Sequence, residues 1–161
     1  WALLGVIAWI TKYFPGKYNN FSIFRQSFWH TLNELPLYAA YPEEYNDIFH
    51  YGPVFSLVVA PFAITPLWLG LLTWPVAQSL FLFWAVKMLP GIKRERIFIY
   101  WFCAHELLTS LFMSQFNISI AAIIVLAYAL IEKEKDVWAA FVIMLGTFTK
   151  LYGITGLAFS P

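Results

Sequence analysis

The chain has 161 residues, of which 61% are hydrophobic and 12% are charged, and its mean hydropathy is +0.67. About a quarter of the residues in a soluble domain are charged, so this composition excludes an ordinary soluble protein and indicates a membrane protein. The net charge of +1 excludes a polybasic nucleic-acid-binding protein, and the single cysteine, Cys103, excludes a disulfide framework and a cysteine-based zinc site.

The first part of the chain alternates between apolar and polar segments. Residues 1–11 are apolar and begin at Trp1 rather than at methionine, so we expect the end of a membrane span and a fragment of a larger polytopic protein. Residues 12–52 are too polar to cross a bilayer, and we expect an outer loop that carries short helices. Residues 53–66 are apolar and bounded by prolines, but they fall short of the roughly 20 residues that a spanning helix needs. They predict an interfacial or re-entrant helix.

The rest of the chain contains four predicted membrane spans, at residues 67–87, 97–113, 118–131 and 137–159. Lys and Arg are concentrated in the short loops that follow the first and the third of these spans. The positive-inside rule places both loops in the cytoplasm. The loop that precedes residue 118 then lies outside, and so do residues 12–52, provided that residues 53–66 do not cross. We therefore expect an all-helical, polytopic bundle surrounded by membrane lipids.

The last predicted span contains one full charge, Lys150, in the apolar sequence MLGTFTKLYGITGLAF. Lys150 lies about 13 residues from the cytoplasmic end of this span, which is roughly 20 Å along a helix and in the outer third of a core of about 30 Å. Either its side chain only reaches up to the headgroups, or it binds an anionic group such as a lipid phosphate. Gly153 and Gly156 permit close approach of another helix or a ligand and favour the second interpretation.

Several short motifs follow one another in a distinctive order. They are NNFSIFRQSFWHTLNELPLYAAYP, HYGPVFSLVVAPFAITP, SQFN and FTKLYGI. In order and spacing they resemble glycosyltransferase family 87, a set of polyprenol-phosphate-sugar-dependent mannosyltransferases and relatives in the C-type (GT-C) superfamily. The resemblance covers about residues 18–159, and the first motif resembles the first outer loop of the family.

The resemblance implies a GT-C-like helical bundle and an inverting membrane glycosyltransferase. Such an enzyme would move a mannose-like hexose from a polyprenol-phosphate donor to a lipid or glycan acceptor. We expect it in a bacterial plasma membrane, with the active site on the extracytoplasmic face. Neither a nucleotide fingerprint nor a cofactor is expected for this chemistry.

Inversion at the anomeric carbon implies a general base that accepts the proton of the acceptor hydroxyl. The position at which the resemblance places a catalytic Asp is occupied by Asn20, and an amide cannot accept a proton as a carboxylate does. We expect Asp47 to serve instead, with Glu34 as the second candidate and Glu43 and Glu44 as the third. For each of these residues the alternative is a solvated loop charge.

The expected substrate-binding residues gather on the outer face. They are Lys150, Gln115, Asn117, His50, Tyr51, Asn20 and Arg25. Gln115 and Asn117 either bind sugar hydroxyls or cap the helix that begins near residue 118. His50 and Arg25 either meet a phosphate or are interfacial and solvated residues. No metal is expected, although the loosely spaced carboxylates of EEYND could hold a divalent cation.

Two other classes of protein compete with the transferase. Prolines at positions 53, 61, 66 and 75 would suit the broken helices of a transporter or channel. The sequence shows no internal repeat, however, and its polar residues gather on one face. A catalytically inactive membrane scaffold of the same fold is also compatible with Asn20.

Overall fold

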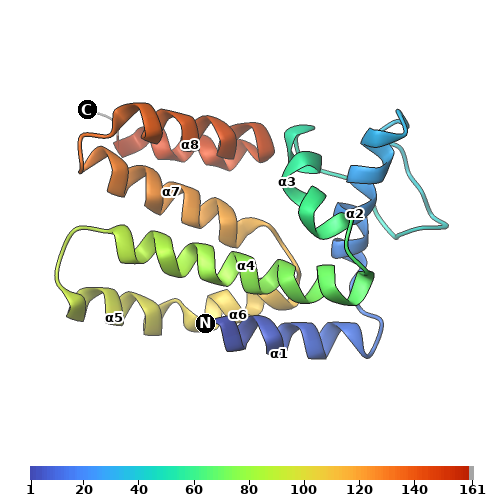
Figure 1. Ribbon diagram of the computed structural model, residues 1–161, viewed down its shortest axis with the longest axis horizontal. Coiled ribbons are helices and arrows are strands. Elements are labelled where there is room, and N and C mark those ends of the chain that lie inside the picture. The colour runs from blue at the N-terminus through green and yellow to red at the C-terminus, as the bar shows by residue number, and fades with distance from the viewer. Residues whose placement is uncertain (160–161) are drawn as a thin grey trace.

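The computed structural model describes residues 1–159, and every regular element within them is a helix (Figure 1). The elements are α1 (Ala2–Tyr13), α2 (Asn19–Leu32), α3 (Val54–Ala63), α4 (Leu67–Met88), α5 (Lys93–Phe102), α6 (Ala104–Phe112), α7 (Asn117–Ile131), α8 (Asp136–Thr149) and the 3₁₀ helix η1 (Leu151–Phe159). The all-helical fold predicted from the sequence is confirmed. Its polytopic arrangement in a membrane stays a prediction.

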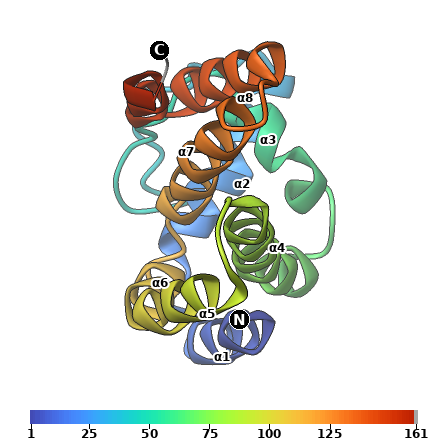
Figure 2. The same cartoon turned by 90° about the vertical axis from the view of Figure 1, so that its left-hand side faces the viewer.

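Most of the helices run along the long axis of the molecule, whereas α2 and α3 lie together at one end (Figure 1). Figure 2 shows α8 above α7, with α4 and then α1 below, and these neighbours contact one another. The largest core cluster lies towards the end with α2 and α3. There the ring of Phe116 packs on Phe55 and Trp74, at centroid distances of 5.0 and 5.8 Å. This packing fixes the turn that leads into α7.

The helix α4 is the one element among residues 1–159 that has both the length and the hydropathy to cross a membrane. Its 22 residues extend over about 33 Å, close to the thickness of a hydrocarbon core. The predicted span over 67–87 coincides with α4 to within one residue, and its crossing of a membrane stays a prediction. The helices α1, α3, α7 and α8 are apolar but shorter. The expected short helix within 53–66 is present as α3, and its place in or on a membrane stays a prediction.

The predicted helix over residues 97–113 is two helices instead of one. At Cys103 the backbone has φ −84° and ψ −6°, which interrupts the regular α-helix between α5 and α6. The carbonyl of Tyr100 accepts a hydrogen bond from the indole N–H of Trp1 at 3.3 Å. A contact between residues 99 positions apart therefore accompanies the break, and no local pattern in the sequence contains that information.

The predicted span over residues 137–159 also differs from the structure, because α8 ends at Thr149. Lys150 is extended, with φ −152° and ψ 127°, and η1 then packs back on α8 and α7 (Figure 1). Gly153 lies against the backbone of Gly146, where a Cβ atom would overlap the helix. A Cβ on Gly156 would come within 2.7 Å of the side chain of Ile143. The glycines permit close approach as expected, but their partners are helices α7 and α8.

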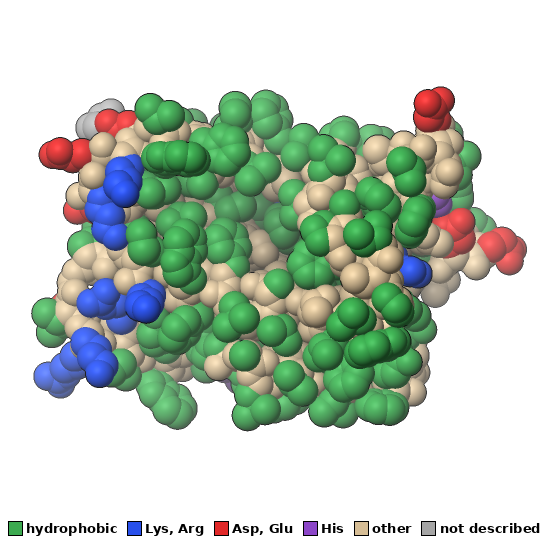
Figure 3. Space-filling view, viewed as in Figure 1, with side chains coloured by type: hydrophobic (Ala, Val, Ile, Leu, Met, Phe, Trp, Pro, Cys, Tyr) green, Lys and Arg blue, Asp and Glu red, His purple; other side chains and the backbone are tan. Residues whose placement is uncertain are grey.

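Charged side chains gather at the two ends of the molecule, and an apolar surface lies between them (Figure 3). The loops that precede α5 and α8 lie at the end that is rich in Lys and Arg (Figures 1 and 3). Residues 12–52 lie at the opposite end, and the turn before α7 lies at the end of α7 that faces them (Figure 1). The loops therefore share ends as the topology prediction requires, while the side of the membrane that each end faces stays a prediction.

Candidate functional site

A hollow of about 250 Å³ lies at the end of the molecule that contains α2 and α3, and we call it the polar hollow. It brings together predicted site residues from the first loop, the turn before α7 and the end of α8. The predicted residues that line it are Asn20, Asp47, His50, Tyr51, Gln115 and Lys150. Three apolar residues that the sequence had not singled out complete the wall, namely Ile23, Phe24 and Ile48.

Gly52 brings the first loop into contact with the end of α8. Its N–H donates a hydrogen bond of 2.9 Å to the carbonyl of Thr149. Its Cα lies so close to the carbonyl of Phe148 that a Cβ atom would overlap that oxygen. Glycine is therefore required here by the close approach of two backbones. His50 and Tyr51 are thereby placed beside the residue that follows α8.

Lys150 is held by neutral partners. Its Nζ donates a hydrogen bond of 2.7 Å to Oδ1 of Asn117 and lies 4.9 Å from the ring centroid of Tyr51 and 5.3 Å from that of Tyr152. Both rings lie within the range of a cation–π interaction. Burial raises the pKa of the Tyr51 hydroxyl, so this ring stays neutral beside the ammonium group.

No carboxylate among residues 1–159 forms an ion pair with Lys150. The amide of Asn117 in turn donates to Oε1 of Gln115 at 2.6 Å, so a continuous chain of contacts leads from the ammonium group to the wall of the polar hollow. A positive charge that is oriented but not neutralised is suited to binding an anionic group.

Asp47 lies in the polar hollow with an unusual backbone conformation. Its φ is +99°, a left-handed value that costs a residue other than glycine about 1–3 kcal/mol. Its Oδ1 accepts a hydrogen bond from the N–H of Ile48 at 2.8 Å and lies 3.5 Å from Nε2 of His50. About two thirds of each of the Asp47 and His50 side chains is exposed, so both are accessible to a substrate. The role of Asp47 as the general base stays a prediction.

Asn20 lines the polar hollow and also joins two elements. Its Nδ2 donates a hydrogen bond of 2.7 Å to the carbonyl of Met113, which fixes α2 to the turn before α7. An ionised carboxylate at this position could not donate that bond. The structure therefore uses the amide of Asn20 at the position where the resemblance places an acid.

Three predicted site residues do not line the polar hollow. Asn117 is joined to it only through its hydrogen bonds with Lys150 and Gln115. Glu34 is exposed just beyond the end of α2, where its φ is +57°. Arg25 donates to the carbonyls of Ala63 at 3.2 Å and Thr65 at 3.4 Å. Arg25 thus ties α2 to the end of α3, which is a structural role.

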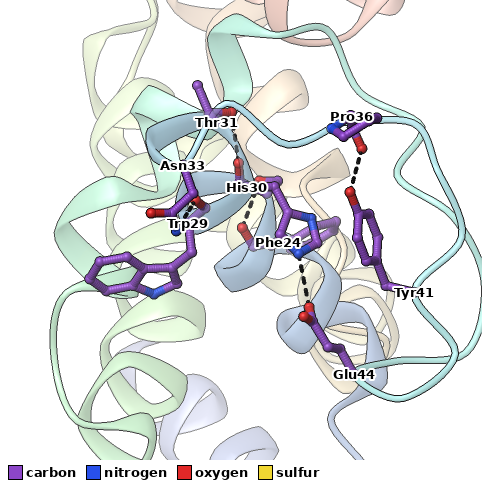
Figure 4. A network of polar contacts seen from close by, with 9 residues as sticks. Phe24, Trp29, His30, Thr31, Asn33, Pro36, Tyr41 and Glu44 are labelled. Carbon is purple, nitrogen blue, oxygen red and sulfur yellow. Dashed lines mark hydrogen bonds and ion pairs between the residues drawn. The ribbon is translucent and has the colours of Figure 1, made fainter.

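One acidic residue of the first loop, Glu44, also has a structural role. Glu44 accepts a hydrogen bond of 2.9 Å from Nε2 of His30, a buried residue of α2 that the sequence had not singled out (Figure 4). The ring of Tyr41 packs on His30 at 3.9 Å between centroids, and its hydroxyl donates to the carbonyl of Pro36 at 2.9 Å. These contacts hold the loop against α2. Within residues 1–159, no three His, Cys, Asp or Glu side chains come together in a way that could hold a metal ion.

A second hollow, of about 500 Å³, adjoins the first, and we call it the aromatic hollow. It includes Tyr38 and Leu151, and it shares His50, Tyr51 and Lys150 with the polar hollow. The hydroxyl of Tyr38 donates to the carbonyl of Tyr51 at 3.1 Å, which fixes this wall. The ammonium group of Lys150 therefore lies where the two hollows meet.

Comparison with known proteins identifies the family. The sequence model of glycosyltransferase family 87 matches residues 49–160, which is more than half of the chain. The chain belongs to this family. Its chemistry is accordingly the transfer of a sugar from a donor to an acceptor, and the family is membrane-associated. Neither the curated proteins nor the solved structures contain a match to this chain.

The matched region of the family 87 chain contains only some of the predicted site residues. Those inside it are His50, Tyr51, Gln115, Asn117 and Lys150. Those before it are Asn20, Arg25, Glu34 and Asp47. The likeness of the first loop to that of the family, which made Asn20 the expected position of the acid, therefore stays a prediction. The contact of Gly52 with the end of α8 lies wholly within the matched region.

Proposed function

We propose that this glycosyltransferase moves a mannose-like hexose, with inversion, from a polyprenol-phosphate donor to a lipid or glycan acceptor on the outer face of the membrane. The observation that carries the proposal is the un-neutralised ammonium group of Lys150 at the junction of the two hollows. The leaving group of such a donor is a phosphate, whose negative charge increases as the bond to the sugar breaks. An oriented ammonium group stabilises that charge more in the transition state than in the bound donor.

The bond changes can be assigned to residues of the polar hollow. The carboxylate of Asp47 takes the proton of the acceptor hydroxyl, and the acceptor oxygen forms a bond to the anomeric carbon of the sugar. The bond from that carbon to the phosphate oxygen breaks, and the lipid phosphate leaves towards Lys150. Gln115 and Asn20 line the same wall and offer amide groups to the sugar hydroxyls. His50 lies beside Asp47 and faces both hollows.

The direct experiment replaces Lys150 and measures the affinity for a polyprenyl-phosphate sugar in lipid nanodiscs. Met keeps the length and the apolar stem of the side chain but removes the charge. We expect Lys150→Met to weaken donor binding roughly ten- to a hundredfold, because a charge-assisted hydrogen bond contributes about 1.5–3 kcal/mol. Lys150→Arg should retain part of the affinity, because its charge remains while the geometry changes.

The matched control is Lys93→Met, which removes an exposed ammonium group at the opposite end of the molecule. It should leave donor affinity unchanged, and thermal unfolding should show that all three variants fold. If the affinity of Lys150→Met equals that of the unmodified protein, the side chain only anchors the end of α8 at the headgroups, and the proposed phosphate site is wrong.

A further inference from the structure

The helix α6 carries two ionisable side chains on its exposed face, within the apolar surface between the two charged ends of the molecule. His105 and Glu106 are adjacent, and 87% and 81% of their side chains are exposed. Figure 1 shows α6 near the middle of the long axis, and Figure 2 shows it at the edge of the bundle, where it contacts α1, α5 and α7. In the predicted span that begins at Ile97, both residues lie about 14 Å along the helix, close to the centre of a hydrocarbon core.

These two side chains have no hydrogen-bond partner among residues 1–159. Nδ1 of His105 lies 3.6 Å from Oε1 of Glu106, which is too long for a hydrogen bond. An ionisable group that is exposed to lipid at this depth is costly, and such groups in membrane proteins pair with one another or face a polar cavity. A partner that covers this face in the membrane therefore has to supply a donor and an acceptor at the same depth.

The residues around the pair form one continuous exposed stripe, which we call the α6 seam. Its members, all exposed, are Phe102, His105, Glu106, Thr109 and Met113. Their spacing of three or four residues puts them on one face of a helix. The opposite face of α6 is buried against the rest of the chain. Apolar side chains around a polar centre are suited to packing one helix on another in a membrane, where polar groups hydrogen-bond across the interface.

We propose that the α6 seam joins two copies of this chain side by side in the membrane, an inference that rests on the predicted span over 97–113 and not on sugar transfer. Copies of one membrane protein share an orientation, so a two-fold axis along the membrane normal brings the same depth of both seams together. His105 of each copy then lies opposite Glu106 of the second copy. An imidazole N–H donates to a carboxylate in each of these two pairs, so the seam is self-complementary, as a two-fold interface requires.

Cross-linking between copies tests the contact. Thr109→Cys in a Cys103→Ser background places one thiol on the seam, and Met144→Cys in the same background places one on the exposed face of α8 as the matched control. Oxidation in native membranes should link most copies of the Thr109→Cys protein as dimers and leave the Met144→Cys protein monomeric. A Thr109→Cys protein that stays monomeric would overturn the proposal. Rapid labelling of its thiol by an impermeant maleimide would do the same, because the seam would then face water.

Exchange of the two charges tests the pairing itself. His105→Glu leaves two carboxylates on each seam and Glu106→His leaves two imidazoles, so neither variant can form the reciprocal pairs with itself. We expect the copurification of two differently tagged copies to fall about tenfold in each variant, the scale of one or two polar contacts between membrane helices. Coexpression of a His105→Glu copy with a Glu106→His copy should restore copurification. The double variant, with both substitutions in every copy, should restore it as well, because it keeps a carboxylate opposite an imidazole.

The restored combinations separate pairing from folding, because a second copy of different charge does not repair a chain that fails to fold. If copurification stays low in the coexpressed variants and in the double variant, or if neither single variant lowers it, the reciprocal pairs do not exist and the proposal is wrong. A cross-link from Thr109→Cys to a different protein instead of a second copy would also contradict it and would assign the seam to another membrane helix.

Discussion

The two ends of the molecule both carry charged side chains, but they hold them in different ways. At the end with α2 and α3, Lys150 donates to Asn117, and Arg25 donates to two backbone carbonyls at the end of α3. At the other end, Arg96 likewise donates to the backbone carbonyls of Lys87 and Gly91, whereas Lys93 and Arg94 are exposed at the start of α5. The comparison shows that an arginine is tied to the backbone at each end, but that a lysine lies in the wall of a polar hollow only where the candidate site is. The exposed charges of the opposite end are those that the positive-inside rule predicts on the cytoplasmic side.

The largest effect is expected in an experiment that determines which side of the membrane each end of the molecule faces. Glu43→Cys and Lys93→Cys, each in a Cys103→Ser background, place a single thiol at an exposed position of each end. The concentration of Lys and Arg near the start of α5 predicts that an impermeant maleimide labels the two thiols from opposite sides. Labelling of both thiols from the same side of sealed vesicles would contradict the arrangement.

The next largest effect is expected at the carboxylate of the polar hollow. Asp47→Asn should lower the turnover of sugar transfer by about a hundredfold to ten-thousandfold, the usual contribution of a general base, without loss of folded protein. Glu34→Gln is the matched control, because Glu34 is exposed in the same loop but outside the hollow, and turnover should not change. Turnover near that of the unmodified protein in Asp47→Asn would transfer the role to another group or favour the scaffold interpretation.

A further test concerns the contact that builds the site. Gly52→Ala places a methyl group against the carbonyl of Phe148, which cannot move without disturbing the end of α8. Overpacking of this kind costs about 1–3 kcal/mol, so the melting temperature in detergent should fall. Donor affinity should fall with it, because the same contact positions Tyr51 beside Lys150. An unchanged melting temperature would show that the first loop and the end of α8 are not joined as described.

The sequence was sufficient where local apolar composition decides the structure. Long apolar runs predicted α4 and α7 closely, because a helix satisfies its own backbone hydrogen bonds whatever surrounds it. The break at Cys103 and the reversal after Thr149 could not be predicted in this way. The first is accompanied by a contact with Trp1, and the second depends on the close approach of η1 to α8.

The candidate site was predictable to a similar extent. The predicted topology puts Lys150, Gln115 and Asp47 on the same side of the membrane. The structure places all three in the wall of one hollow. Positions within the first loop could not be derived, because they depend on how the loop packs on α2. For that reason Arg25 was expected at the site, while the buried partner of Glu44, His30, was overlooked.

The smallest effect is expected from restoring the acid that the family resemblance suggests. Asn20→Asp removes the N–H that donates to the carbonyl of Met113 and, above the pKa of the new carboxyl, sets a negative charge against that oxygen. We expect a loss of about 1–2 kcal/mol in the free energy of unfolding at neutral pH. A protonated carboxyl can donate the bond again, so folding raises the pKa of the introduced carboxyl group. The stability of the variant should therefore be highest below the ordinary pKa of an aspartic acid and fall as the pH rises through the raised value. Asn20→Ala lacks the carboxyl and should show no such dependence on pH. If Asn20→Asp instead gained stability with rising pH and restored turnover to an Asp47→Asn protein, position 20 rather than position 47 would be the place of the base.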